Sequence, residues 1–383
     1  FSNLLITWVS LPLSTYFICY HMKQLHHRLS GLLFLSGFVF LQSCLKNDLP
    51  TAPVIKPATI DSSVTELFRA PIGVVAGTGG TSMTLNDGRV LWLYGASHLN
   101  DMNGSGQIAC TPNVHNAMVL QQGNQWTTVN AFGADAIPSN EANTWFEPLH
   151  AYQFFDTVFV FAKKVGTGAQ HDTYIAKFRF PDMQFLRTDS IGTAGTSFGY
   201  SVVVDTAIGF CYIYGLHQPS LTLQNDLFLA RFSLNNPHTP WLYYSSTGWV
   251  NVASASLPLA KVPGENVSIR KVKGKYILLT QDAGKNCNQG TAISSSIGAD
   301  AWGPFNNPTQ LYTISDKLNG TTPVTFGACL QPQWLNASNE IIVTYCIDGY
   351  APCVTTCTNG FDEADYHRLK AIRVSLKNID PSY

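Results

Sequence analysis

Short runs of apolar and aromatic residues recur along this chain, and each run follows a turn. The runs share one composition, in which Val, Leu, Ile, Phe and Tyr dominate; they are Val90–Gly95, Val158–Ala162, Cys211–Gly215, Lys275–Thr280 and Ile341–Tyr345. They recur at intervals of roughly 50 to 70 residues, and no sustained 3.6-residue period accompanies them. The pattern predicts an all-β chain built from five similar units.

Each run has a neighbouring apolar strand on either side in the sequence. The upstream strands are expected at 81–85, 147–154, 199–204, 266–272 and 327–335, and the downstream strands at 116–121, 174–180, 227–232, 291–295 and 369–376. Asn86-Asp87-Gly88 and Lys273-Gly274 are typical of tight hairpin turns, because glycine accepts a positive φ angle. Each unit is therefore expected to hold three or four antiparallel strands.

Five such units predict a five-bladed β-propeller. A blade has two apolar faces that it cannot cover alone, and stacking five blades in a ring buries all of them. Two β-sandwiches in tandem are the alternative, but they do not account for five similar hairpins.

The segment 22–44 has the pattern of an export signal. Lys23 and Arg28 precede the uncharged apolar stretch Leu29–Leu41, which is shorter than the ~20 residues that a membrane-spanning helix needs. The stretch ends in Leu41-Gln42-Ser43-Cys44, which resembles the lipobox of bacterial lipoproteins. An ordinary signal peptide with a chance cysteine is the alternative.

This resemblance implies a domain plan and a location. Residues 1–21 are expected to be an over-extended gene start (the alternative is an extra membrane segment), 22–43 a lipoprotein signal peptide, 44–66 a tether lipidated at Cys44, and 67–383 the propeller. A lipid on Cys44 would anchor the protein to a membrane. The expected location is the bacterial outer membrane, on its periplasmic or exposed surface.

Composition excludes two classes of protein. Only 12% of the 383 residues are charged, and 23 Lys and Arg face 24 Asp and Glu, so the chain lacks the positive charge that nucleic-acid binding needs. The 45% hydrophobic content excludes a disordered chain. Seven cysteines follow Cys44, so at least one is unpaired. Cys353 and Cys357 are candidates for a small disulfide loop, and Cys211 and Cys346 for buried thiols.

Several segments carry a family resemblance: Asp87–Gly95, Gly209–Gly215, Leu227–Phe232, Glu265–Thr280 and Ala301–Pro304. They resemble five-bladed propellers of uncharacterised bacterial secreted families, which are distantly similar to arabinanase, β-xylosidase and levansucrase glycosidases. The resemblance implies a carbohydrate ligand and carboxylates around the propeller axis.

Glu265 and Glu147 are the candidate catalytic residues. Each stands at the start of an expected inner strand, Glu265 in the fourth unit and Glu147 in the second. In glycosidases one carboxyl group protonates the leaving oxygen and a second activates water or attacks the sugar. The alternative is that both carboxylates only cap turns at strand ends.

Five further residues are candidates for substrate binding. Trp145 and Tyr200 have rings that can stack on a sugar, although packing between blades would also use them. In the first unit the relatives tend to have a carboxylate where this chain has Ala96, and the segment 76–82 contains no acid. Three loop residues are candidates to replace that carboxylate, or are simply solvated: His98, Asp101 and His115.

Three functions follow as hypotheses. The first is a glycosidase-like hydrolase, the second a glycan-binding propeller without catalysis, and the third a scaffold for a protein of an outer-membrane complex. No cofactor and no metal is expected, since the acidic run 362–365 lacks the spaced ligands of a calcium loop and is typical of an exposed loop. The protein is expected to be a monomer.

Overall fold

The computed structural model describes residues 57–383, except 131–132, 167–171, 218–223, 266, 283, 285, 350, 352 and 355. The predicted gene start, the signal peptide, Cys44 and most of the tether lie outside the described residues. Among the residues that are described, no helix combines the length and the hydropathy that a membrane crossing requires.

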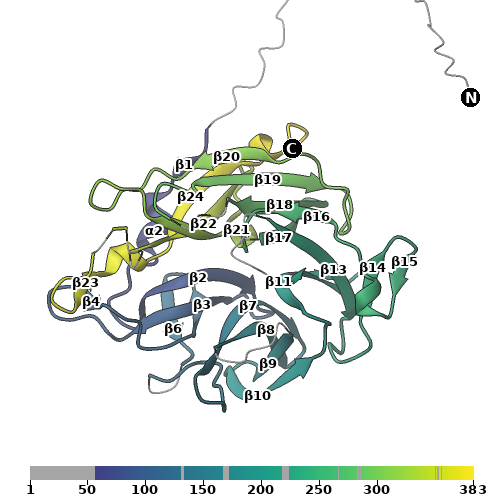
Figure 1. Cartoon of the computed structure of the whole chain (residues 1–383), viewed down its shortest axis with the longest axis horizontal. Coiled ribbons are helices and arrows are strands. Elements are labelled where there is room, and N and C mark those ends of the chain that lie inside the picture. Colours follow the sequence, from purple (N-terminus) through teal and green to yellow (C-terminus); the bar gives the residue numbers. More distant parts are fainter. Residues whose placement is uncertain are drawn as a thin grey trace, which may run out of the picture. The chain divides into compact units, whose positions relative to one another are not determined.

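Five antiparallel sheets surround a common centre (Figure 1). The first blade consists of β2 (Val74–Thr84), β3 (Val90–Leu99), β5 (Ala117–Gln122) and β6 (Gln125–Thr128). The second consists of β7 (Thr144–Phe154), β8 (Thr157–Gly166), β9 (Thr173–Arg179) and β10 (Gln184–Ile191). The third consists of β11 (Thr196–Asp205), β12 (Phe210–His217), β13 (Asn225–Ser233), β14 (Leu242–Ser245) and β15 (Gly248–Val250), with β16 (Ala260–Val262) also paired to β13. Together with the two remaining blades described next, these three blades confirm the prediction of an all-β, five-bladed propeller.

The fourth blade consists of β17 (Val267–Val272), β18 (Lys275–Gln281), β19 (Ala292–Gly298) and β20 (Thr309–Thr313). The fifth consists of β21 (Val324–Gln331), β22 (Glu340–Asp348), β24 (Lys370–Ser375) and β1 (Thr59–Ile60). A separate pair joins β4 (Gln107–Ala109) to β23 (Phe361–Glu363). The short helices are α2 (Ser62–Glu66), α3 (Leu376–Ile379), and the 3₁₀ turns η1 (Ala253–Ala255), η2 (Pro332–Trp334) and η3 (Ala364–His367).

Residues from the start of the described chain complete the last blade. Thr59 and Ile60 of β1 pair with Arg373 and Ile372 of β24, so the outermost strand of the fifth blade comes from before the first blade. This pairing holds the two ends of the ring together. The propeller therefore begins before the expected boundary at residue 67, and 59–66 belong to it rather than to the tether.

Strand β12 shows why the strands of the blades have almost continuous apolar sequences. Side chains alternate between the faces of a strand. Cys211 and Ile213 pack in one interblade cluster, whereas Tyr212, Tyr214 and Leu216 pack in another. Both faces of the blade are therefore buried against neighbours, and neither face needs polar residues.

The hairpin between β17 and β18 confirms one predicted turn. Lys273 and Gly274 both have positive φ angles, 47° and 86°, and Val272 pairs with Lys275 across the turn. Two positive φ angles in a two-residue loop match the right-handed twist of the flanking strands.

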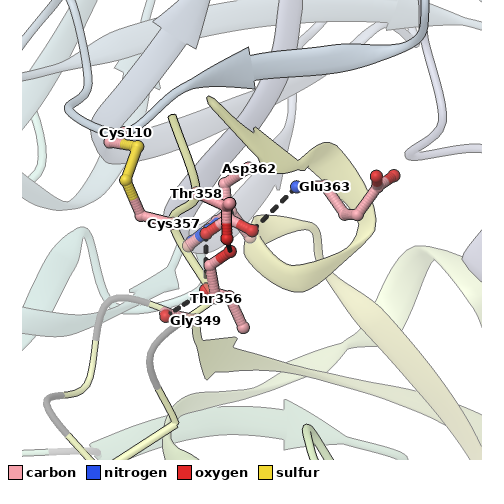
Figure 2. Close-up of a disulfide and its surroundings, with 8 residues drawn as sticks. Cys110, Gly349, Thr356, Cys357, Thr358, Asp362 and Glu363 are labelled. Atoms are coloured by element: carbon pink, nitrogen blue, oxygen red, sulfur yellow. Dashed lines mark hydrogen bonds and ion pairs between the residues drawn. A yellow bond between two sulfur atoms is a disulfide. The ribbon is translucent and has the colours of Figure 1, made fainter. Parts of the chain in front are cut away.

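Two disulfides correct the cysteine prediction. Cys357 pairs with Cys110 and Cys353 pairs with Cys287, so the small loop predicted between Cys353 and Cys357 is wrong. Figure 2 shows the first of these bonds beside the β4–β23 pair. The geometric reason is that β4 and β23 bring residues 247 positions apart into contact, which local spacing does not reveal. The buried thiols predicted at Cys211 and Cys346 are confirmed, and Cys329 is a third.

Candidate functional site

The innermost strands of the five blades line the propeller axis, and each contacts its two neighbours around the ring. We call the end where these strands start the amino-terminal mouth, and the end where they finish the carboxy-terminal mouth. Glu147 lies near the start of β7, and Glu265 lies just before β17. Both candidate catalytic residues are therefore at the amino-terminal mouth.

Lys163 joins the two glutamates. Its Nζ lies 2.9 Å from Oε2 of Glu147 and 3.0 Å from Oε2 of Glu265. Lys163 is the register partner of Glu147 on the adjacent strand β8, whereas Glu265 arrives from the fourth blade. The two carboxylate oxygens are thus separated by no more than the sum of these two distances. We call these three residues the Glu–Lys–Glu cluster.

Tyr200 extends the cluster. Its hydroxyl donates a hydrogen bond to Oε2 of Glu265 over 3.4 Å. Burial raises the pKa of Tyr200, although Lys163 opposes this, so the phenol stays protonated. Burial by itself would lower the pKa of Lys163, but Tyr200 and the two carboxylates outweigh it and raise that pKa. Lys163 is therefore a permanent cation at neutral pH.

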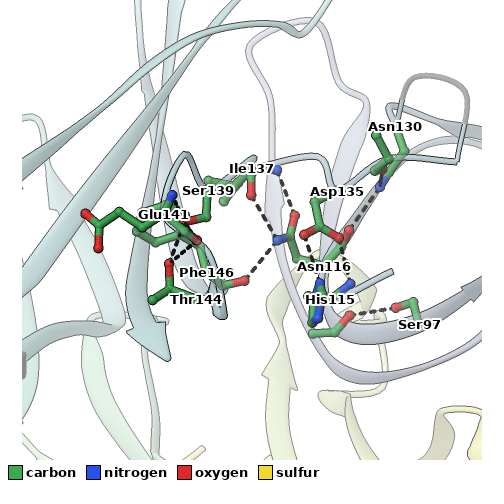
Figure 3. A network of polar contacts seen from close by, with 12 residues as sticks. Ser97, His115, Asn116, Asn130, Asp135, Ile137, Ser139, Glu141, Thr144 and Phe146 are labelled. Atoms are coloured by element: carbon green, nitrogen blue, oxygen red, sulfur yellow. Dashed lines mark hydrogen bonds and ion pairs between the residues drawn. The ribbon is translucent and has the colours of Figure 1, made fainter. Parts of the chain in front are cut away.

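Trp145 lies two residues before Glu147 on β7, so both side chains are on the same face of the strand. Its ring stacks on His115, with centroids 4.8 Å apart and planes 20° apart. Asp135 accepts a hydrogen bond from the His115 backbone N–H (2.7 Å) and faces its ring nitrogen (Figure 3). The structure thus brings two of the candidate binding residues, Trp145 and His115, into contact.

Buried Asn116 holds this region in place. Its side-chain amide donates to the carbonyls of Ile137 (3.1 Å) and Phe146 (2.9 Å), and its side-chain oxygen accepts from the Ile137 N–H (2.7 Å). These contacts tie the loop that carries Asp135 to β7, as Figure 3 shows. The His115–Trp145 stack therefore sits on a rigid support.

His98 and Asp101 form a different cluster. His98 is buried and its Nδ1 lies 2.7 Å from Asp101, and burial lowers its pKa. Its ring centroid is 6.3 Å from that of His367, which contacts Asp362 (3.0 Å). His98 is thus not presented to solvent as a sugar-binding side chain would be.

The acidic run 362–365 differs from its prediction as an exposed loop. Asp362 is only 2% exposed and accepts a hydrogen bond from Thr356 (2.5 Å), which Figure 2 shows. Pairing of β23 with β4 draws this residue inward, while Glu363 and Asp365 stay outside. No group of three or more His, Cys, Asp or Glu side chains in the described ranges is arranged to hold a metal ion.

The sequence reasoning missed Lys163. One signal was available: Lys163 and Lys164 end an otherwise apolar strand in a chain with few charges. A lysine next to a buried strand usually has a carboxylate partner. Nothing in the sequence, however, indicates that the partners come from two blades.

Comparisons with known proteins agree with this fold. A family model described as "Domain of unknown function (DUF5005)" matches residues 61–376. A candidate hydrolase from Bacteroides ovatus is similar in structure, with a TM-score of 0.67, 16% identity and coverage of 84% of this chain and 92% of that one. No curated protein matches the sequence. The predicted relation to an uncharacterised propeller family is confirmed.

Two glycosidase structures show a weaker similarity. A GH43 β-xylosidase/α-arabinofuranosidase from a compost microbial metagenome has a TM-score of 0.49, 12% identity and coverage of 82% of this chain and 94% of that one. A GH43_1 enzyme from Xanthomonas citri, complexed with xylotriose, has a TM-score of 0.46, 13% identity and coverage of 82% and 93%.

Proposed function

This chain belongs to the DUF5005 family, and we propose that its propeller is a carbohydrate-active module that takes a sugar at the amino-terminal mouth. One observation carries the proposal: Glu147 and Glu265 come from different blades and meet at Lys163. Their side chains are 36% and 24% exposed, so a ligand can reach them. The Trp145–His115 stack on the same face of β7 supplies an aromatic surface for a sugar ring.

Hydrolysis of a glycosidic bond is the first candidate activity. Glu265 would protonate the leaving oxygen while Glu147 attacks the sugar carbon, and Glu265 would then activate the water that releases the sugar from Glu147. Their shared contact with Lys163 keeps the two Oε2 atoms closer together than the ~6.5–9.5 Å that leaves room for an attacking water, as a pair in which one carboxylate attacks the sugar directly requires. The Lys163 ammonium contacts Oε2 of Glu265, so a bound sugar must first displace it from that oxygen.

Reducing-sugar release from a panel of polysaccharides tests this activity. We expect Glu265→Gln to lower release by about 100-fold or more, because the general acid is lost. Glu141→Gln is the matched control, since it also removes a carboxylate paired to a lysine, Lys164, but at a side chain that is 69% exposed. Unchanged release in Glu265→Gln would refute the assignment.

Glycan binding without hydrolysis is the second candidate, and Lys163 favours it. Its ammonium occupies Oε2 of both glutamates, the atoms that would have to contact the substrate in hydrolysis. Strands β2 and β3 of the first blade contain no Asp or Glu, and Ala96 of β3 stands where a carboxylate was expected. Binding on a glycan array by a wild-type protein that releases no sugar would identify this function. If the protein neither binds a glycan nor releases sugar, the proposal as a whole is contradicted.

We also propose that the protein is exported and anchored by a lipid on Cys44. Support comes from the charged, apolar and lipobox-like order of residues 22–44. Native protein from a bacterial host should partition with membranes and begin at a lipid-modified Cys44 by mass spectrometry. Cys44→Ala should move it to the soluble fraction, and an unmodified membrane-bound variant would count against the anchor.

A further inference from the structure

The carboxy-terminal mouth holds a cavity of about 540 Å³. Its walls include the ends of β2, β7 and β11 and the residues that follow β21, so it lies at the opposite end of the axis from the Glu–Lys–Glu cluster. The volume falls in the ~300–1,000 Å³ range of small-molecule sites. No Asp or Glu is among the lining residues.

Arg270 of β17 lines this cavity and is only 6% exposed. Its Nη1 donates to Oγ of Ser201 (2.9 Å) and to the carbonyl of Ile269 (3.1 Å), and its Nη2 lies 3.5 Å from Sγ of Cys329. Within the described part of the chain, no carboxylate forms an ion pair with it. A buried guanidinium without a counter-charge is costly, and an anion in the cavity would remove that cost.

Two further polar residues line the same cavity. His150 and Tyr152 lie on one face of β7, are 4% and 1% exposed, and line the cavity. Neither the His150 Nε2 nor the Tyr152 hydroxyl has a hydrogen-bond partner among the described residues. Such orphaned buried groups usually bind water or a ligand.

Two of these three groups are donors whichever tautomer the histidine adopts. Nδ1 of His150 lies 2.7 Å from the Ala151 nitrogen and 2.8 Å from the Ala151 carbonyl oxygen, so it accepts from the first or donates to the second according to the tautomer. Burial and the charge of Arg270 lower the pKa of His150, so the ring is neutral, and Nε2 is a donor in one tautomer and an acceptor in the other. The tyrosine hydroxyl and the guanidinium are donors in both cases, and the guanidinium adds one positive charge.

The remaining walls are largely apolar. The apolar side chains that line the cavity include Phe154, Phe155, Val202, Val204 and Leu234. Phe155 is 76% exposed. An apolar body attached to the anionic group would bury against these side chains. We propose that the carboxy-terminal mouth is a binding site for a small organic carboxylate, whose carboxylate group meets Arg270 and Tyr152 and whose apolar part contacts the phenylalanines.

Isothermal titration calorimetry with phenylacetate tests the site, and phenylacetamide is the neutral isostere. We expect phenylacetate to bind with one-to-one stoichiometry and phenylacetamide to bind at least tenfold more weakly. Equal affinity for the two compounds, or no binding of phenylacetate, would overturn the proposal. Glu265→Gln should leave phenylacetate binding unchanged, which separates this site from the proposed carbohydrate site.

Two single substitutions test whether phenylacetate binds in this cavity. Val204→Glu adds a negative charge at a cavity residue that is 39% exposed, and should weaken phenylacetate binding at least tenfold without loss of folding. Ile208→Glu is the matched control, since Ile208 is 50% exposed and does not line the cavity. Equal weakening by both variants would place the ligand elsewhere.

Cys329 provides a second check, since its Sγ is the sulfur that contacts Nη2 of Arg270. We expect Cys329→Ser to bind phenylacetate as the wild type does. Binding by Cys329→Ser but not by the wild type would show that the thiolate already neutralises Arg270, and would overturn the proposal.

Discussion

Gly199 shows how one residue positions the candidate site. It has a φ angle of 118°, and a Cβ at this position would lie 2.4 Å from Cβ of Phe161. The pairing of β11 with β12 shifts register here, between Phe198 and Ser201. The next residue is Tyr200, whose hydroxyl reaches Glu265. A residue with no side chain thus permits the backbone path that delivers Tyr200 to the cluster.

Gly199→Ala should therefore lower the free energy of unfolding by about 2 to 4 kcal/mol, through backbone strain and overpacking against Phe161. Chemical denaturation measures the loss. Gly192→Ala is the control, because a Cβ at Gly192 meets nothing within 4 Å. A loss in Gly199→Ala no larger than that in Gly192→Ala would contradict this account.

At the scale of elements, α2 and β1 close the ring through Asp61. Oδ1 of Asp61 accepts from the Val64 N–H (3.0 Å) as the N-cap of α2, and Oδ2 accepts from Nε of Arg373 (2.7 Å) on β24. Burial opposes the charge of this carboxylate. Hydrogen bonds from Ser63 and Val64, together with Arg373, outweigh burial and hold the pKa of Asp61 below its ordinary value. One side chain thus stabilises both the helix start and the closing strand.

Asp61→Ala should cost about 2 kcal/mol at pH 7, and Asp61→Asn less, because asparagine keeps the cap but not the ion pair. A carboxylate with a lowered pKa stabilises the fold fully above the unfolded-state pKa of about 4, and this contribution is lost as pH falls through the lower folded-state pKa. The difference in melting temperature between wild type and Asp61→Asn should therefore shrink toward pH 2. A difference that grows on acidification would refute the role of the charge.

At the scale of the whole molecule, the two disulfides span very different lengths of chain. Cys110–Cys357 closes 247 residues and links segments from the first and last blades, whereas Cys287–Cys353 closes 66. A crosslink that closes a longer loop removes more entropy from the unfolded chain. The first bond therefore adds to the closure that β1 provides.

Replacing Cys110 and Cys357 by Ser should lower the unfolding free energy by about 2 to 5 kcal/mol. The matched pair Cys287→Ser with Cys353→Ser should cost less, because its loop is shorter. Denaturant titrations of the two double variants give the ranking. The opposite order would show that local packing, rather than loop entropy, dominates.

The blades were predictable because their signals are local. The apolar and aromatic residues of Cys211–Gly215 predict a strand by themselves. Lys273-Gly274 predicts a turn, because glycine permits the positive φ angle that the turn needs. Glu147 and Glu265 became candidates for a similar reason, since a carboxylate at the start of an apolar strand is visible in the sequence.

The partners of those residues were not predictable. Three contacts join residues from different blades or from distant parts of the chain. They are the ion pairs of Lys163 with both glutamates, the disulfide between Cys110 and Cys357, and the shared cavity wall of Arg270 and His150. The strands, turns and repeats could thus be predicted from the order of side chains, because each depends on residues that are close together in the sequence. Contacts across the axis depend on how far the closed ring rotates one blade against the next, and only the folded chain specifies that.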